Sequence, residues 1–192
     1  QHPPIQVSGE FAFRNGPQEP SFYLNLGLLP TSVTAQQQLV PSLLLPEEVA
    51  SWLYSALPQG KINTSAFVFA GPLANPRFEL ATSFSQTQFK FQPDWPSLTQ
   101  AQGKFYLDDG WLKGQVTQAK IGQAKLSQAR FATYPGQEKA NRNFSFLSLS
   151  TQLNTPTQAF SWLAANSPLK HEIPASIQQW QFGGQLTGQL EL

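Results

Sequence analysis

Apolar and polar residues alternate along most of this 192-residue chain, and that pattern decides which folds are open to it. In residues 5–13, Ile5, Val7, Phe11 and Phe13 alternate with polar or small residues, the period of two that is typical of a half-buried strand. Similar segments recur at 22–26, 62–70, 78–84, 88–91, 104–107, 111–116, 124–131, 144–153, 180–182 and 186–192. The sequence therefore predicts a mainly β protein whose strands each have one apolar face.

Two connections between these strands have sequence signals of their own. Asp108, Asp109 and Gly110 lie between two predicted strands, and Asp-Gly tolerates the positive φ angles of a tight hairpin. The polar segment 134–143 predicts a loop. Because the chain both begins and ends in strand-like sequence, we expect 5–13 and 186–192 to lie at the sheet ends.

Two segments have helical rather than β periodicity, 46–57 and 156–165. Pro46 and Pro156 suit the first turn of a helix, and Thr155 is a candidate cap for the second one. Each segment contains a Trp-Leu pair, and we expect Trp52 and Trp162 to pack these helices on the sheet.

The two helical phrases lie about 110 residues apart, which indicates an excerpt from a longer repetitive β protein. We expect a first unit in residues 1–134, with helix 46–57, and the start of a second in 143–192, with helix 156–165.

The charge content excludes several classes of partner. Only 12% of residues are charged, against about 25% in ordinary soluble domains. The 12 basic and 11 acidic residues are dispersed along the chain, so the sequence gives no electrostatic footprint for nucleic acid or an anionic bilayer. No apolar run approaches the roughly 18 to 20 residues of a spanning helix. The sequence therefore predicts no membrane-spanning helix in these residues.

Residue types that catalyse reactions or bind metals do not occur here in the spacings that such sites require. His2 and His171 are far apart and have no metal-ligand spacing, and the chain contains no Cys. Asp94, Asp108 and Asp109 are interpreted as turn residues rather than paired catalytic carboxylates. No nucleophile elbow, P-loop or dinucleotide fingerprint occurs. We therefore expect no enzyme, no catalytic or metal site and no cofactor.

Large apolar side chains are abundant on the predicted strands, with 15 Phe, 5 Trp and 4 Tyr in the chain. Two short helices, each about 10 Å wide, cannot cover a sheet of about ten strands. Either the sheet folds over into a β-sandwich, which periodicity alone favours, or part of its apolar face forms a groove.

Several ordered motifs resemble the YhdP family of AsmA-like envelope proteins. The resemblance covers most of the chain and is carried by the segment 46–60, Phe67-x-Phe69-x-Gly71-Pro72-Leu73, Phe91-x-Pro93-x-Trp95-Pro96-x-Leu98, Ser167-Pro168-Leu169 and Gly183-x-x-x-x-Gly188-x-Leu190-x-Leu192. It implies a twisted, curved antiparallel sheet of the repeating β-groove type, an open half-barrel. It also implies a periplasmic fragment of a protein anchored in the inner membrane of a Gram-negative bacterium, with neighbouring repeats of the same chain as partners and a role in phospholipid transport toward the outer membrane. The family brings no catalytic residues.

An apolar trough of this kind shields acyl chains from water at about 25 cal/mol per Å² of buried apolar surface. The candidate lining residues are the strand apolars Phe67, Phe69, Phe78, Leu80, Phe84, Phe89, Phe91, Phe105 and Leu107. Because trough residues are exposed, Asp at Phe69 or Phe91 is expected to leave the fold intact. No Arg/Lys cluster is evident to hold phosphate, so acyl chains are expected to bind without headgroup specificity.

Two other function classes stay open. A structural spacer, built as a closed β-sandwich, requires no exposed apolar patch of several hundred Å². A carbohydrate-binding module would use Trp95, Trp111 and Trp180 as stacking platforms.

Overall fold

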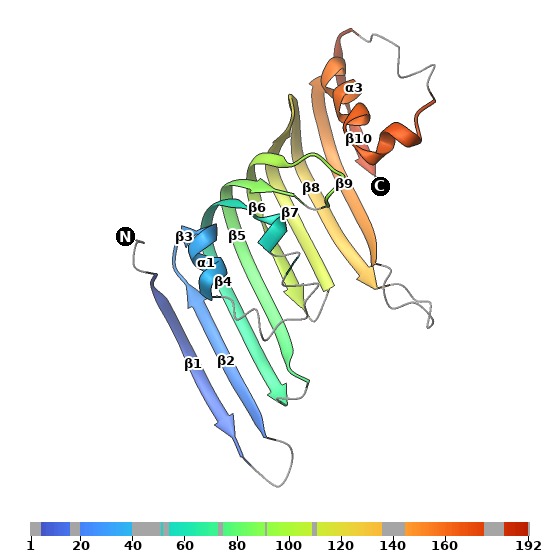
Figure 1. Cartoon of the computed structure of the whole chain (residues 1–192). Helices are drawn as coiled ribbons and strands as arrows, with labels where there is room; N and C mark the ends of the chain where they lie inside the picture. The colour runs from blue at the N-terminus through green and yellow to red at the C-terminus, as the bar shows by residue number, and fades with distance from the viewer. Residues whose placement is uncertain are drawn as a thin grey trace.

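The alternating segments form one antiparallel sheet, which Figure 1 shows from its face. The computed structural model describes residues 5–15, 20–39, 51, 54–72, 75–90, 92–108, 111–135, 145–174 and 183–191. In these residues the sheet has ten strands: β1 (Val7–Arg14), β2 (Ser21–Leu28), β3 (Thr31–Ser32), β4 (Gln59–Pro72), β5 (Arg77–Phe89), β6 (Leu98–Asp108), β7 (Trp111–Ile121), β8 (Ala124–Pro135), β9 (Ser145–Pro156) and β10 (Gln185–Glu191).

Neighbours in the sheet are neighbours in the chain, in the order β1-β2-β4-β5-β6-β7-β8-β9-β10, while short β3 pairs with β4. Every pairing is antiparallel, as expected for strands joined by hairpins. Asp108 pairs with Trp111, which confirms the two-residue hairpin. The single open sheet confirms the curved-sheet prediction, and the β-sandwich alternative is wrong.

The two ends of the sheet are β1 and β10, as the strand-like termini of the chain predicted. Both sequence units contribute to one continuous sheet, because β8 pairs with β9 from Lys125–Asn154 to Pro135–Ser145. The predicted strand 180–182 lies outside the described residues.

Helices α1 (Val33–Leu39) and α3 (Thr157–Ala165) and the short 3-10 helix η2 (Pro168–His171) accompany the sheet in the described part of the chain. Helix α3 confirms the prediction for 156–165, but its N-cap is Pro156 and no side chain caps it. Thr155 is buried at the end of β9, so the expectation that it caps α3 is wrong. Of 46–57, residues 51 and 54–56 are helical, and Trp52 lies outside the described residues.

Helix α1 was not predicted from the sequence, because seven residues give too short a helical period. Its local signal is Ser32, whose Oγ accepts a hydrogen bond of 3.1 Å from the Ala35 N–H. A serine in this position satisfies a backbone donor of the first helical turn.

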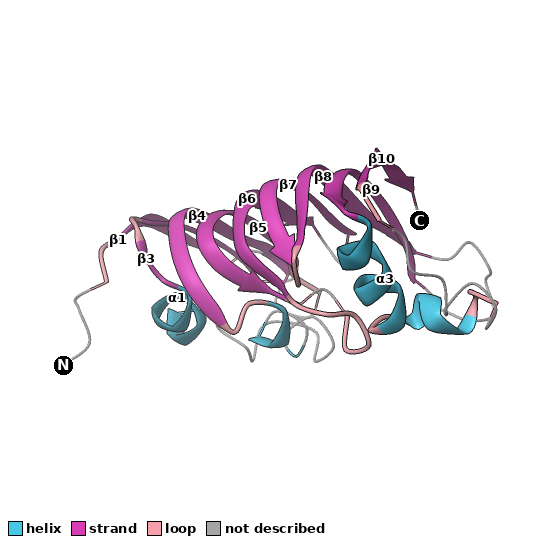
Figure 2. Ribbon diagram, turned by 90° about the horizontal axis from the view of Figure 1, so that it is seen from above, coloured by secondary structure: helices cyan, strands magenta, loops and turns pink. Residues whose placement is uncertain are grey.

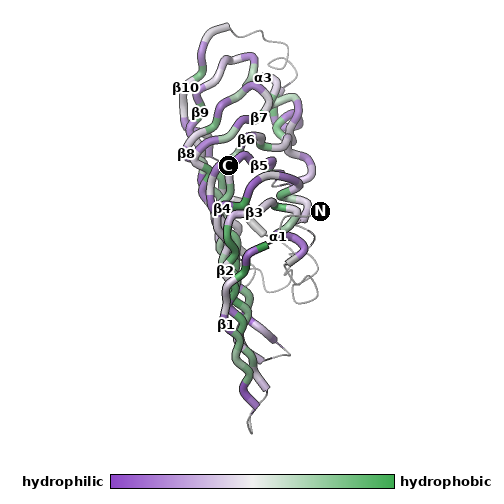
Figure 3. Tube along the Cα trace, turned by 90° about the vertical axis from the view of Figure 1, so that its left-hand side faces the viewer, coloured by the Kyte–Doolittle hydropathy of each residue, from purple (hydrophilic) through white to green (hydrophobic). Residues whose placement is uncertain are grey.

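Strand alternation gives the sheet two chemically different faces. Cross-strand partners such as Phe69–Phe78 and Leu80–Leu107 place the large apolar side chains on one side, which we call the apolar face. Figures 2 and 3 show α1 and α3 on one side of the sheet, which curves around them. Val33 of α1 and Leu163 of α3 belong to the same buried cluster as the strand apolars, so the helices cover the apolar face. The opposite side is the polar face.

Three of the strand irregularities lie at glutamines whose backbone is left-handed. Gln86, Gln100 and Gln128 have φ angles of 50°, 53° and 53°, and the strand register shifts beside each of them. Bulges of this kind bend a strand and increase its twist. The predicted segments 78–84 and 88–91 are thus one strand, β5, which passes through a bulge and keeps Phe84 and Phe89 on the same face.

Candidate functional site

Eight of the nine candidate trough residues lie together on the apolar face, and Phe91 lies outside the described residues. They come from three adjacent strands: Phe67 and Phe69 from β4, Phe78, Leu80, Phe84 and Phe89 from β5, and Phe105 and Leu107 from β6. Their rings meet across the strands, with centroids 4.9 Å apart for Phe67–Phe78 and 6.3 Å for Phe84–Phe105. The sheet therefore gathers these residues into one aromatic surface.

All eight of these side chains are buried, and Phe69 is 0% exposed. Its ring lies 4.6 Å from that of Phe22 and 6.3 Å from that of Phe67, centroid to centroid. The expectation that Phe69 is exposed is therefore wrong, and Phe69→Asp should destabilise the fold, because a carboxylate there would be desolvated without a partner. That the eight residues contact lipid stays a prediction.

The apolar face is exposed at the β1 end of the sheet. Phe11 is 69% exposed and Phe13 55%, although their partners on β2, Leu24 and Phe22, are half-buried. The sequence analysis found the alternation in this strand but did not include its residues among the trough candidates. Alternation shows which face a residue takes, but not whether another element covers it.

A small cavity of about 50 Å³ lies between α3 and the sheet. Its lining is apolar apart from Thr151 and includes Phe89, Trp95 and Leu163. Trp162 is 43% exposed and contacts the β7–β8 turn, since a Cβ at Gly122 would lie 2.6 Å from its Cζ3. Helix α3 thus docks through Ala159 and Leu163, with Trp162 against the turn.

One polar cluster interrupts the apolar face. Gln36 of α1 donates from Nε2 to Oγ of Ser65, at 2.8 Å, and the Ser65 and Thr82 hydroxyls are 2.9 Å apart. All three residues are buried, and they join α1 to β4 and β5. The alternation of the strands could not predict this contact, because it depends on the position of α1.

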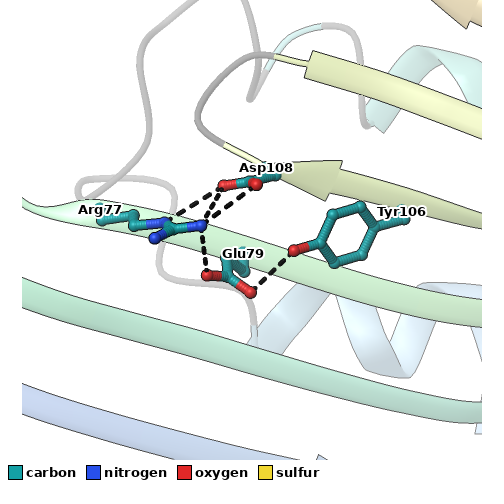
Figure 4. Close-up of polar contacts among 4 residues, drawn as sticks. All are labelled: Arg77, Glu79, Tyr106 and Asp108. Atoms are coloured by element: carbon teal, nitrogen blue, oxygen red, sulfur yellow. Dashed lines mark hydrogen bonds and ion pairs between the residues drawn. The ribbon is translucent and has the colours of Figure 1, made fainter.

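On the polar face, Arg77 forms an ion pair with two carboxylates (Figure 4). Its Nη2 lies 3.0 Å from Oε1 of Glu79 and 3.1 Å from Oδ1 of Asp108. The Tyr106 hydroxyl donates to Oε2 of Glu79 at 2.8 Å, and this hydrogen bond, together with burial, raises the pKa of Tyr106. The same carboxylates raise the pKa of Arg77, the Asp108 hydrogen bond most of all.

The polar face concentrates charge that the sequence had shown as dispersed. Strands β4 to β8 contain two acidic residues, Glu79 and Asp108. They contain seven basic ones: Lys61, Arg77, Lys104, Lys113, Lys120, Lys125 and Arg130. Register places all of these on the polar face. The inference that the chain has no electrostatic footprint and no Arg/Lys cluster is therefore wrong, because strand pairing aligns cations that are far apart in sequence.

The tryptophans proposed as stacking platforms do not share a surface. Trp95 packs against the core on the apolar face, whereas Trp111, which is half exposed, is on the polar face. Trp180 lies outside the described residues. Within the described ranges, no three His, Cys, Asp or Glu side chains gather as metal ligands do, and no helix could cross a membrane.

Comparisons with known proteins converge on one family. The family described as YhdP protein matches residues 1–192. The chain is also similar to a protein of Escherichia coli (strain K12) named intermembrane phospholipid transporter YhdP, with 26% identity over 161 residues. That alignment covers 79% of this chain and 12% of the relative, so the chain spans only a small part of the relative's length. No solved structure matches the chain.

Proposed function

The chain belongs to the YhdP family, and from that membership we propose that it is a segment of a non-enzymatic protein that transports phospholipid between the inner and outer membranes. The similar E. coli protein carries the name of an intermembrane phospholipid transporter, which supports a lipid as the cargo. The proposed compartment is the periplasm of a Gram-negative bacterium. Membrane contact is assigned to parts of the parent protein outside this chain.

The observation that supports this function is the continuity of the apolar face. Apolar residues face the same side from Phe11 on β1, through Leu24, Phe69 and Leu80, to Leu153 on β9. Nine paired strands at about 4.8 Å spacing span about 38 Å. An acyl chain covers about half of a 30 Å bilayer core, so the apolar face is longer than one acyl chain.

We place the first lipid contact at the β1 end, where Phe11 and Phe13 are exposed and Leu24 is half-buried. Farther along the same face lie the buried candidates, which an acyl chain would reach only where the elements that cover them are displaced. These candidates are Phe67, Phe69, Phe78, Leu80, Phe84, Phe89, Phe105 and Leu107, with Phe91 proposed beside them. Burial of a new apolar surface contributes about 25 cal/mol per Å², which requires no fixed polar contact and permits lateral movement.

The edges of the sheet support a repeat array. Strands β1 and β10 each have one unpaired side in the described part of the chain, and an unpaired edge accepts a further strand. We propose that neighbouring repeats of the parent protein continue the sheet at both edges. In that arrangement the exposed apolar face at β1 continues into the preceding repeat, and units 1–134 and 143–192 are consecutive members of the array.

The experiment compares two adjacent residues of β1 whose side chains point to opposite faces. A photo-crosslinking amino acid replaces Phe11 on the apolar face or Ala12 on the polar face, in the full-length parent protein inside cells. Both positions are exposed, so the fold should tolerate either change. We expect phospholipid adducts from position 11 and not from position 12. Equal labelling at both positions, or none at either, would contradict the proposal.

A structural spacer is the second candidate, and the burial of the eight central candidates favours it. A transfer assay separates the two functions. Phe11→Asp should slow phospholipid transfer between vesicles by the parent protein, whereas Ala12→Asp should leave it unchanged. Under the spacer function, neither substitution alters lipid transfer.

A further inference from the structure

The polar face contains a hollow of about 680 Å³ that extends from β4 to β8. Its floor includes the small residues Ala66 and Ala81, which leave the space open. Its rim includes Lys104, Lys113 and Arg130. Ligand sites in proteins commonly measure about 300 to 1,000 Å³, so this hollow has the size for a small molecule or a headgroup.

The three cations of the rim come from three adjacent strands. Gln115 of β7 pairs with Lys104 of β6 on one side and with Arg130 of β8 on the other. Two strand spacings separate the Lys104 and Arg130 backbones by about 10 Å, and Lys113 lies on the strand between them. Long, flexible side chains at these positions can converge on one ligand.

No acidic side chain in the described part of the chain forms an ion pair with any of these three cations. The two carboxylates of β4 to β8, Glu79 and Asp108, are both paired with Arg77. The Lys113 ammonium lies 5.1 Å from the centre of the Tyr106 ring, a contact that leaves its charge uncompensated. Three like charges around one hollow repel each other, and an anion placed between them would relieve that repulsion.

We propose that this hollow binds a phosphate ester. A phosphate monoester carries a charge of about −1.5 to −2 at pH 7, which matches several cations better than a single carboxylate does. Arg130 can hold two phosphate oxygens at once, and a lysine ammonium is a common point-charge partner. The Thr64 and Ser83 hydroxyls and the Gln115 amide also line the hollow and can bond a hydroxylated ligand body.

This ligand is distinct from a lipid on the apolar face, because the sheet separates the two surfaces. The inference therefore does not depend on the transport function. An added peptide strand is a poor occupant, since β5, β6, β7 and β8 have a paired strand on both sides. The phosphate can come from a soluble ester or from a lipid headgroup at a membrane surface, and the experiment distinguishes these sources.

The test uses the 192-residue chain with glycerol 3-phosphate as the soluble probe, measured by titration calorimetry. The variant K104Q/R130Q removes two rim cations. The matched control K120Q/K125Q removes two cations from the same face outside this hollow, from a directly opposed lysine pair. We expect the first variant to bind about tenfold more weakly or worse and the second less than about threefold more weakly, because hydrogen bonds to charged groups contribute most of such affinity. Circular dichroism checks that both variants remain folded.

Two further ligands complete the test. Vesicles containing phosphatidic acid present the same monoester as a headgroup. The headgroup is the source if the chain binds these vesicles but not glycerol 3-phosphate, and if K104Q/R130Q abolishes the vesicle binding. A hexaglutamate peptide tests for a general polyanion surface. The proposal is overturned if neither phosphate ligand binds, if hexaglutamate binds as tightly as the phosphate ligands, or if both double variants lose affinity equally.

Discussion

Gln36 on α1 donates a 2.8 Å hydrogen bond from its side-chain nitrogen to Oγ of Ser65, which lies 29 residues away on β4. Ser65 is in turn 2.9 Å from Oγ1 of Thr82 on β5. These buried groups join α1 to the sheet, and Gln37 of the same helix adds hydrogen bonds with Leu57 and Tyr54. A helix of seven residues has little stability of its own, so its position depends on such tertiary contacts.

Gln36→Ala is therefore expected to lower the free energy of unfolding by about 1 to 3 kcal/mol, since it removes a buried hydrogen bond and leaves a gap. Urea unfolding followed by circular dichroism measures the change. Gln38→Ala is the control, because Gln38 lies on the same helix with an exposed side chain. Equal effects of the two substitutions would show that the buried contact does not hold α1.

Phe69→Ala and Phe11→Ala should separate the covered and the open parts of the apolar face. Phe69 is fully buried, and truncation of such a side chain costs about 3 to 5 kcal/mol. Phe11 is 69% exposed, so its truncation should cost less than about 1 kcal/mol. Thermal and urea unfolding of both variants provide the comparison. A large loss for Phe11→Ala would mean that a covering element closes the β1 end.

Gly122→Ala should disturb the docking of α3. Gly122 has a φ angle of +57°, and a Cβ there would lie 2.6 Å from the Trp162 ring. Both the left-handed backbone and the clash oppose a side chain, so we expect a loss of about 1 to 3 kcal/mol in unfolding free energy. Gly183→Ala is the control, since no atom of the described residues lies within 4 Å of its added Cβ. If Gly122→Ala leaves both the unfolding free energy and the tryptophan fluorescence unchanged, the contact between Gly122 and Trp162 is contradicted.

Thr155→Val is expected to stabilise the protein by up to about 1 kcal/mol. The Thr155 Oγ1 is buried and has no hydrogen-bond partner among the described residues, and an unpaired buried hydroxyl costs free energy that a methyl group of similar size avoids. The branched shape is kept, so the strand should not be disturbed. Ser167→Ala provides a contrast, because the Ser167 hydroxyl accepts a hydrogen bond from Leu169 and its loss should destabilise the chain. Destabilisation by Thr155→Val would reveal a partner for the hydroxyl.

Tyr106 should ionise at a higher pH than an ordinary tyrosine. Its hydrogen bond to Glu79, and then burial, raises its pKa above the usual value of 10.0, so the folded state favours the protonated form. The stability that this raised pKa contributes is fully present below the pKa of Tyr106 in the unfolded chain. It is lost as the pH rises through the pKa of Tyr106 in the folded chain. The pH titration of tyrosinate absorbance is measured for the chain and for Tyr106→Phe, and the difference between the two curves is the ionisation of Tyr106.

Glu79→Ala removes the acceptor and should lower the pKa of Tyr106 toward the ordinary value. An unchanged midpoint in the absorbance titration of this variant would show that Glu79 does not control the ionisation.

The sequence was most informative where the physics is local. Alternation of period two identified most strands and their apolar residues, because successive strand side chains point to opposite faces. Asp109 and Gly110 identified the hairpin before β7, since positive φ angles select a few residue types. Pro156 identified the start of α3, since its fixed φ suits the beginning of a helix.

Other features had no local signal. Gln86, Gln100 and Gln128 have left-handed backbone, which the sequence could not predict because glutamine does not favour that conformation. The bulges that curve the sheet were therefore missed. Helix α1 was missed because its two turns are too short to show the helical periodicity of apolar residues. The eight described trough candidates share one face, but the exposed end at Phe11 was not among the candidates.

By itself, therefore, the sequence determined the strands, the face that each apolar residue takes within its strand, and the family to which the chain belongs. Only the tertiary structure decided that Phe69 is covered while Phe11 is exposed, and that cations as distant in sequence as Lys104 and Arg130 surround one hollow. The physical reason is that alternation depends on neighbouring residues of one strand. Burial and charge clustering depend on strand register, sheet curvature and the elements placed over each face, which long-range packing sets.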